Sequence, residues 1–217
     1  MTLFNLIDER TLSQLTQGAA IRQFFRDAPL VTRGEPSDLV VLIKGLVRIS
    51  RDDLIVDFVR APAILAASCV LLQEPSAVTI ASVRNSEAAF VDAAKFHALL
   101  GSSPQLAERL AAQLSRENHD LLTRMTELVT GDVEERLETL LNRLALRHGV
   151  PLNGGRFFAL PVRRRDLARM IDASTETVSR TLAEWKRRGW TYSNRSGIWW
   201  GGRPSRAARS SERSSAQ

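Results

Sequence analysis

Cysteine and histidine are scarce in this chain, whose 217 residues include one cysteine, Cys69, and three histidines. A single cysteine excludes a disulfide within the chain, a four-cysteine iron–sulfur site and a zinc ribbon. The histidines, at positions 97, 119 and 148, stand in unrelated contexts and show no metal-ligand spacing. We therefore expect no metal site.

Long apolar runs and catalytic motifs are also missing. No run approaches the ~18 apolar residues of a membrane span, and the N-terminus lacks the pattern of a signal peptide. The sequence has no paired carboxylates in a motif, no phosphate-binding glycine loop and no nucleophile elbow. These absences predict a cytoplasmic protein that is not an enzyme and has no membrane partner.

Positive charge is concentrated near the C-terminus. The net charge is +6, yet residues 1–150 hold 16 lysines and arginines against 19 acids, whereas residues 151–217 hold 14 against 5. This asymmetry is typical of a nucleic-acid-binding domain attached to a domain that does not bind nucleic acid. A solvated basic face with a basic tail is the alternative. The charge alone therefore does not establish DNA binding, and a sequence motif is needed to support it.

Residues 163–188 supply that motif, because they read as two short helices joined by a tight turn. The apolar residues at helical spacing are Leu167, Met170 and Ile171 in the first helix and Val178, Leu182 and Trp185 in the second. Ser174 is a candidate N-cap. Glu176, Ser179 and Arg180 fall opposite the apolar stripe, as a helix that enters the DNA major groove requires.

Short apolar, β-branched runs separated by turn signals follow a short amphipathic helix within residues 1–16. The runs lie at residues 20–25, 39–43, 46–49, 54–59, from 78 into the early 80s, and 87–91. Short strands at roughly 8–12-residue spacing predict a sandwich or barrel.

A long helix is expected from Pro104 to Thr130, because proline suits a first helical turn and neither glycine nor proline follows. Its apolar stripe with heptad spacing consists of Leu110, Leu114, Leu121, Met125 and Leu128. Such a stripe is typical of helix pairing, and we expect a homodimer. The alternative is a helix packed on its own barrel.

Gly131 and Asp132 interrupt the helical pattern, which makes them a candidate hinge, with Asp132 the candidate N-cap of a helix at residues 133–148. A short strand is expected at residues 157–162. Residues 190–200 predict a β-hairpin, which would complete a winged helix.

The predicted fold is therefore α+β, with an N-terminal sandwich or barrel of short strands and a C-terminal winged helix-turn-helix. The expected divisions are a β domain at 1–103, a dimerisation helix at 104–130, a DNA-binding domain at 131–202 and a disordered basic tail at 203–217.

This domain order resembles the cyclic-AMP receptor protein and fumarate–nitrate reduction regulator (CRP/FNR) superfamily of bacterial transcription factors. The resemblance implies that the β domain at 1–103 is a jelly-roll-like, sensor-like β-roll. The most specific match runs from Asp166 to Arg180, and Leu42 to Ile49 is similar to the family's lysine–glycine turn. The family usually has glycine where this chain has Asp172, and aspartate accepts turn conformations.

The resemblance implies that Glu176, Ser179 and Arg180 read bases, on a palindrome with TTGAT-like half-sites. Arg180 can donate to guanine, Glu176 can accept from cytosine, and Ser179 can contact thymine or a neighbouring edge. A helix-dipole or ion-pair role for Glu176 and a plain surface role for Arg180 are the alternatives. Phosphate contacts that set register are expected from Arg169, Ser174, Thr175 and Thr177. The implied partners are double-stranded DNA and, for an activator, RNA polymerase.

The sensor half departs from the cyclic-AMP branch, which binds its ligand's phosphate through a short helix opening Gly-Glu-Leu and a following Arg-Ser pair. Here residues 64–72 read Ile-Leu-Ala-Ala-Ser-Cys-Val-Leu-Leu, residues 75–79 read Pro-Ser-Ala-Val-Thr, and the adenine-facing polar pair is Leu121 and Leu122. Burying a phosphate without a cation is costly. We expect no cyclic-nucleotide binding.

What replaces the nucleotide stays open. Haem-using relatives ligate iron through histidine, cysteine or an N-terminal group, so Cys69 and His97 are the candidate effector ligands. A buried inert thiol and a surface histidine are the simpler interpretations. An apolar effector is another alternative, and so is no effector at all. We expect no cofactor, with a haem- or small-molecule-dependent regulator as the competing hypothesis.

Overall fold

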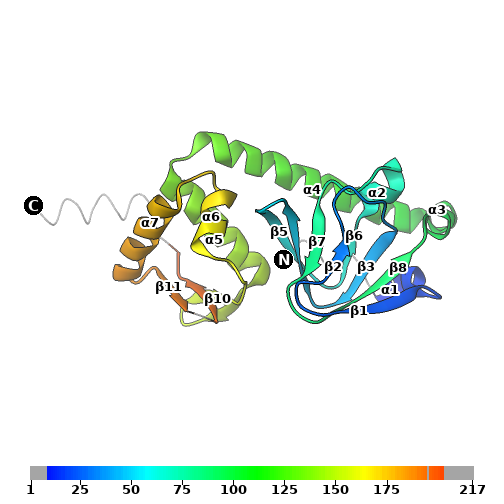
Figure 1. Cartoon of the computed structure of the whole chain (residues 1–217), viewed down its shortest axis with the longest axis horizontal. Coiled ribbons are helices and arrows are strands. Elements are labelled where there is room, and N and C mark those ends of the chain that lie inside the picture. The colour runs from blue at the N-terminus through cyan, green and yellow to red at the C-terminus, as the bar shows by residue number, and fades with distance from the viewer. Residues whose placement is uncertain (1–8, 195, 203–217) are drawn as a thin grey trace, which may run out of the picture. The chain divides into compact units, whose positions relative to one another are not determined.

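The structure is a computed structural model that describes residues 9–194 and 196–202. The chain divides into two compact units between Thr126 and Glu127, inside a continuous helix. Figure 1 labels the elements. Those of the first unit, with the helix that leaves it, are α1 (Glu9–Thr16), β1 (Ala20–Phe24), β2 (Pro29–Val31), β3 (Leu39–Lys44), β4 (Leu46–Arg51), β5 (Leu54–Arg60), β6 (Ala63–Leu65), α2 (Ala67–Leu72), β7 (Thr79–Ser82), β8 (Ser86–Val91), α3 (Ala93–Ser102) and α4 (Pro104–Thr130).

The strands of the first unit form two four-stranded antiparallel sheets, with the orders β1-β8-β3-β6 and β2-β7-β4-β5. This arrangement confirms the predicted β-roll. The sequence prediction missed β2 and β6, which have three residues each. Runs of that length are too short to show an alternating pattern.

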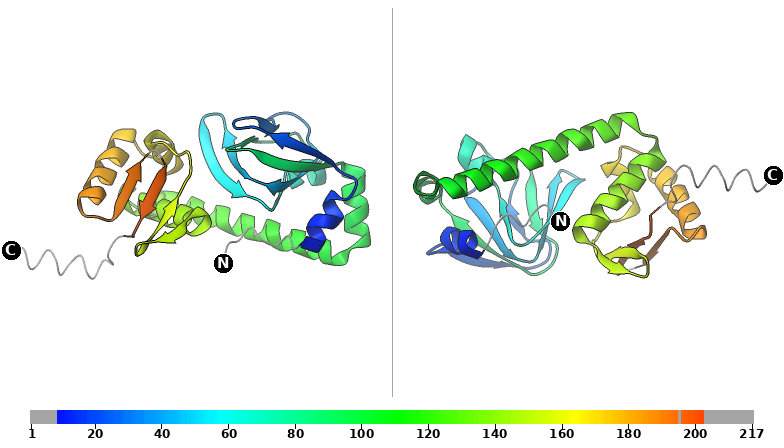
Figure 2. Two further views of the ribbon diagram at one scale, coloured as in Figure 1. Left: turned by 90° about the horizontal axis from the view of Figure 1, so that it is seen from below. Right: turned by 180° about the vertical axis from the view of Figure 1, so that it is seen from behind.

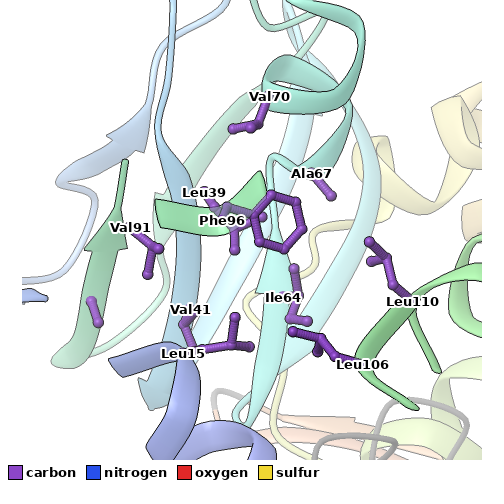
Figure 3. Close-up of a cluster of buried hydrophobic side chains, with 11 residues drawn as sticks. Leu15, Leu39, Val41, Ile64, Ala67, Val70, Val91, Phe96, Leu106 and Leu110 are labelled. Atoms are coloured by element: carbon purple, nitrogen blue, oxygen red, sulfur yellow. The ribbon is translucent and has the colours of Figure 1, made fainter. Parts of the chain in front are cut away.

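Strand β3 lies between two apolar cores, which explains its unbroken apolar sequence. Leu39 and Val41 point into a core formed with the helices, whereas Val40 and Leu42 point into the core between the sheets. Neighbouring side chains of a strand face opposite sides, so a strand buried on both faces reads as continuously hydrophobic. Figure 3 shows the helix-side core around Phe96, whose side chain is fully buried.

Helix α4 changes surroundings along its length. Its bounds confirm the predicted start and end. Leu106 and Leu110 belong to the helix-side core of the β-roll, and Leu110 is only 6% exposed (Figure 3). The assignment of Leu110 to the dimer stripe is therefore corrected: its own domain covers that side chain. Farther along, Leu114, Leu121 and Met125 are exposed. The side chain of Leu128 lies outside the described part.

An ion pair joins α4 to β5 farther along the helix. An Nη of Arg124 donates to Oδ2 of Asp57 at 2.7 Å, and the two side chains are 15% and 12% exposed. The other carboxylate oxygen accepts from the amide of Phe58 at 2.9 Å. The pair thus connects the C-terminal half of α4 to the edge strand of a sheet through one carboxylate oxygen, and the other oxygen is bonded within β5.

We expect the substitution Asp57→Asn to lower the free energy of unfolding by about 2 kcal/mol, because it leaves a largely buried guanidinium without its counter-charge. Urea denaturation at neutral pH measures this. Asp53→Asn on the exposed turn between β4 and β5 is the matched control, with an expected change within about 0.5 kcal/mol. Equal effects of the two substitutions would show that the pair does not stabilise the roll.

The second unit carries three helices and a small sheet, seen from two sides in Figure 2. The sheet order is β11-β12-β10-β9. Its elements are α5 (Val133–His148), β9 (Val150–Leu152), β10 (Gly155–Phe158), α6 (Arg164–Met170), α7 (Thr175–Arg187), β11 (Thr191–Asn194) and β12 (Gly197–Trp200).

The hairpin predicted after the second helix of the motif is confirmed by β11 and β12. The strand expected at 157–162 instead begins at Gly155 and ends at Phe158, and it pairs with β9, which was not predicted. Residues 203–217, predicted to be a disordered tail, lie outside the described residues. No helix of the described ranges is both long enough and apolar enough to traverse a bilayer.

Asp132 starts α5 as predicted. Its carboxylate accepts from the Glu135 amide at 2.8 Å, and the Glu135 carboxylate accepts in return from the Asp132 amide at 3.3 Å. This reciprocal capping box fixes the first turn of α5 directly after Gly131. The start of the second unit's first full helix is therefore well defined, while a hinge role for Gly131 and Asp132 stays a prediction.

Candidate nucleic-acid interface

Helices α6 and α7 form the helix-turn-helix, and α7 is anchored by one face. Val178 and Trp185 are almost completely buried, and Thr181 lies between them on the same side. The Trp185 ring packs against Trp200 of β12, with ring centroids 5.3 Å apart. The apolar spacing in the sequence therefore identified the docking face of α7 correctly, and the wing strand helps to hold it.

The turn between α6 and α7 uses a left-handed backbone at Asp172, with φ of 51°. Aspartate tolerates this conformation better than most residues other than glycine, which confirms the sequence interpretation. The amide of Ala173 then donates to the Ala168 carbonyl at 2.9 Å. Ser174 caps α7 as predicted: its Oγ accepts from the Thr177 amide at 3.0 Å and lies 2.8 Å from the Thr177 hydroxyl. The position at which α7 starts is thereby fixed.

The predicted base-reading residues lie together on α7. Glu176 and Arg180 are exposed and Ser179 is half-buried. Within residues 9–194 and 196–202 neither Glu176 nor Arg180 forms an ion pair. An intrahelical salt bridge, the alternative for Glu176, is therefore absent. An exposed carboxylate and guanidinium one turn apart can each be presented to base edges.

Ion pairs instead occupy the C-terminal end of α7. Glu184 pairs with Arg187 and with Arg188, the latter at 2.6 Å. The hydrogen bond from Arg188 holds the pKa of Glu184 below its usual value, and the charges of both arginines act in the same direction. These contacts favour the ionised carboxylate where cations also suit the helix dipole, and they lie away from the N-terminal turns of α7, which carry Glu176 and Arg180.

The residues predicted to contact phosphates are placed at this end as well. Arg169 and Thr175 are exposed, while the hydroxyls of Ser174 and Thr177 are engaged with each other in the cap. The structure adds a run that the sequence reasoning had not singled out as phosphate contacts: residues 163–165, three consecutive exposed arginines that form the N-cap and the first two positions of α6. Their adjacency to a helix start was the available signal.

The first unit places the candidate effector ligands on separate helices. Cys69 is buried in α2, and His97 is exposed on α3. The described residues contain no group of three potential metal-ligating side chains. Ser76, in the segment after α2, is buried and donates its hydroxyl to the Val78 carbonyl at 2.7 Å. The only hydroxyl in residues 73–78 is thus already engaged, and no cation stands in that segment.

Two family models match the chain in the order of its two units. One, described as "Cyclic nucleotide-binding domain", matches residues 21–103, and one described as "Crp-like helix-turn-helix domain" matches residues 135–199. The chain belongs to the CRP/FNR superfamily. It is a CRP-like transcription regulator with a helix-turn-helix DNA-binding domain, which confirms the family named from the sequence.

Relatives in this CRP/FNR superfamily extend over most of the chain. A "CRP-like cAMP-activated global transcriptional regulator" of Mycobacterium tuberculosis is 26% identical over 199 residues, or 87% of each chain. Two solved structures share the fold. The c-di-GMP-responsive global regulator CLP of Xanthomonas campestris has a TM-score of 0.76 at 20% identity, covering 90% of this chain and 100% of that one. FixK2 of Bradyrhizobium japonicum has a TM-score of 0.68 at 22% identity, covering 84% of this chain and 92% of that one.

Proposed function

We propose that this CRP/FNR-type regulator binds a palindromic operator with TTGAT-like half-sites, that it does so as a homodimer, and that it needs no cyclic nucleotide. Double-stranded DNA is then its principal partner in the cytoplasm, and RNA polymerase joins it if it activates transcription. The observation that carries the proposal is the exposed side of α7, where Glu176 and Arg180 lie one turn apart behind a well-capped helix start.

Base reading follows from the chemistry of these side chains. The Arg180 guanidinium can donate two parallel hydrogen bonds to O6 and N7 of guanine, and the Glu176 carboxylate can accept from N4 of cytosine. Ser179, half-buried beside them, has only a short reach and suits a close contact with a thymine or a neighbouring base edge. Guanine, cytosine and flanking A·T pairs are the content of a TTGAT-like half-site.

Dimerisation is supported by the exposed part of α4. Leu114 is 36% exposed, Leu121 50% and Met125 65%, and Leu114 and Leu121 are seven residues apart. Apolar residues at this spacing suit the seam of a two-helix coiled coil. A twofold pair would present two copies of α7 to half-sites about one DNA turn, ~34 Å, apart, and a palindrome has that symmetry.

Independence from cyclic nucleotides rests on the chemistry of the sensor half. Residues 73–78, in the segment that would bind a phosphate, offer no cation, and their one hydroxyl, that of Ser76, is buried and already bonded, while the Glu74 carboxylate would repel an anion. At the two positions of α4 that the resemblance assigns to the adenine, this chain exposes the side chains of Leu121 and Leu122. Neither set can satisfy the charge of a phosphate or the hydrogen bonds of a purine.

Fluorescence anisotropy with a labelled TTGAT-N4-ATCAA duplex and a scrambled duplex, at physiological salt, tests the proposal. We expect the affinity for the palindrome to exceed that for the scrambled duplex by at least about 10³-fold. Saturating cyclic AMP should leave both affinities unchanged. Equal affinity for the two duplexes would reject the operator, and binding only with cyclic AMP would reject independence. A visible spectrum of the same sample tests the competing hypothesis, because bound haem absorbs strongly.

A further inference from the structure

One arginine of α5 connects the candidate hinge to the turn of the helix-turn-helix. Arg136 lies in the first turn of α5. Its Nη1 donates to the Gly131 carbonyl at 2.9 Å, and its Nη2 donates to the Asp172 carbonyl at 3.2 Å. Gly131 stands between α4 and the cap of α5, and Asp172 stands between α6 and α7. A single side chain therefore bonds to the backbone at two separate breaks between helices.

The chemistry of these two bonds suits arginine in particular. A guanidinium is planar and presents donors in a fixed fork, so it can serve two carbonyls that lie in different directions. A charged donor also makes stronger hydrogen bonds than a neutral one. The aliphatic stem also passes close to Gly131, because Cγ of Arg136 lies 3.4 Å from the position that a Cβ on Gly131 would occupy, so a side chain there would touch the stem. The side chain is half-buried.

Local structure at each end does not depend on this arginine. The turn is closed by the Ala173 amide on the Ala168 carbonyl and by the Ser174 cap. The start of α5 has its own capping box, and the buried leucines of α5 hold that helix in the domain core. What Arg136 adds is a link between the two breaks.

We propose that Arg136 is a positioning residue, which couples the backbone at Gly131 to the placement of recognition helix α7. It acts through two main-chain carbonyls and does not touch DNA. The inference rests on the proposed function of α7 in reading an operator. Removing the guanidinium frees the Asp172 peptide from the hinge, so α7 is held less closely in the orientation that base contacts require, whereas contacts with phosphates tolerate small displacements.

The test compares Arg136→Met, Arg136→Lys and Arg143→Met with the wild-type chain. Arg143 also lies on α5 and pairs with Glu127 of α4 at 3.3 Å. Its replacement therefore removes another half-buried cation of α5 without altering the described contacts of Asp172. For Arg136→Met we expect about a tenfold loss of affinity for the palindrome, with scrambled-duplex affinity within about twofold and the salt slope unchanged, since no phosphate contact is lost. Arg136→Lys recovers part of the loss, and Arg143→Met causes less than about a threefold loss.

Amide hydrogen exchange of the DNA-free proteins gives an independent measure. We expect faster exchange at residues 172–177 in Arg136→Met, with exchange in the middle of α5 unchanged. Equal losses of affinity for both duplexes, with a smaller salt slope, would show that Arg136 contacts phosphate and would overturn the proposal. Unchanged binding and unchanged exchange would also overturn it. If the wild-type chain itself fails to prefer the palindrome, the proposed operator fails, and the exchange data then decide whether the link exists.

Discussion

Replacing Leu121 by glutamate is expected to make the protein monomeric and to weaken its binding to the palindrome by roughly 100-fold or more, the typical gain from linking two binding modules. Leu121 is half-exposed on α4, so each chain keeps its own core. A carboxylate in a helix seam would be buried against its copy without a counter-charge, which is strongly unfavourable. Sedimentation equilibrium gives the mass, and anisotropy gives the affinity.

Thr123→Glu is the matched control for this substitution. Thr123 is exposed two positions along the same helix, and its hydroxyl bonds back to the His119 carbonyl at 3.0 Å. Two positions correspond to about 200° around a helix, so this side chain lies away from the stripe. A dimer that survives Leu121→Glu, or one that is lost equally in Thr123→Glu, would show that the chains do not pair through the stripe.

The second large effect concerns base discrimination. We expect Arg180→Ala to lose about 1–3 kcal/mol of preference for guanine in each half-site, with little change in binding to scrambled DNA. The reason is that an exposed guanidinium, which forms no ion pair in the described part of the chain, has its two parallel donors available for one base. Competition with duplexes changed only at that base pair measures the loss.

Arg169→Ala provides the contrast. As a predicted phosphate contact it should weaken binding to every sequence alike and reduce the salt slope by about 1. Both variants remove an exposed arginine from the same motif, so a difference between them isolates base reading from general electrostatics. If Arg180→Ala instead behaves as Arg169→Ala is expected to, Arg180 is a positioning cation and the half-site assignment is wrong.

Long periodic elements and caps were predictable from the sequence. Both ends of α4, the start of α5 at its aspartate cap and the serine cap of α7 agree with the structure because each depends on local chemistry. Glu176 and Arg180 were placed correctly for the same reason: an amphipathic period decides which side of a helix is exposed. The three-residue strands were not predicted. β9, for example, contains Pro151 and spans too few residues to show an alternation of apolar and polar side chains.

Two features required the three-dimensional structure. The heptad spacing identified which residues share a face of α4, but it could not show that the β-roll covers Leu110. The role of Arg136 carries no sequence signal at all, because its partners are carbonyl oxygens, which every residue possesses, and one of them lies 36 positions away. Contacts with the backbone across long sequence separations remain invisible to motif analysis.

That reliance on carbonyl oxygens has an evolutionary consequence. Because Arg136 binds the backbone of position 172 and not its side chain, the residue at that position can change without loss of the bond, provided that it accepts the left-handed conformation. Asp172, with its φ of 51°, is such a residue. Under the proposed role of Arg136, the residue at position 172 can therefore vary, whereas the arginine cannot be replaced without loss of the link.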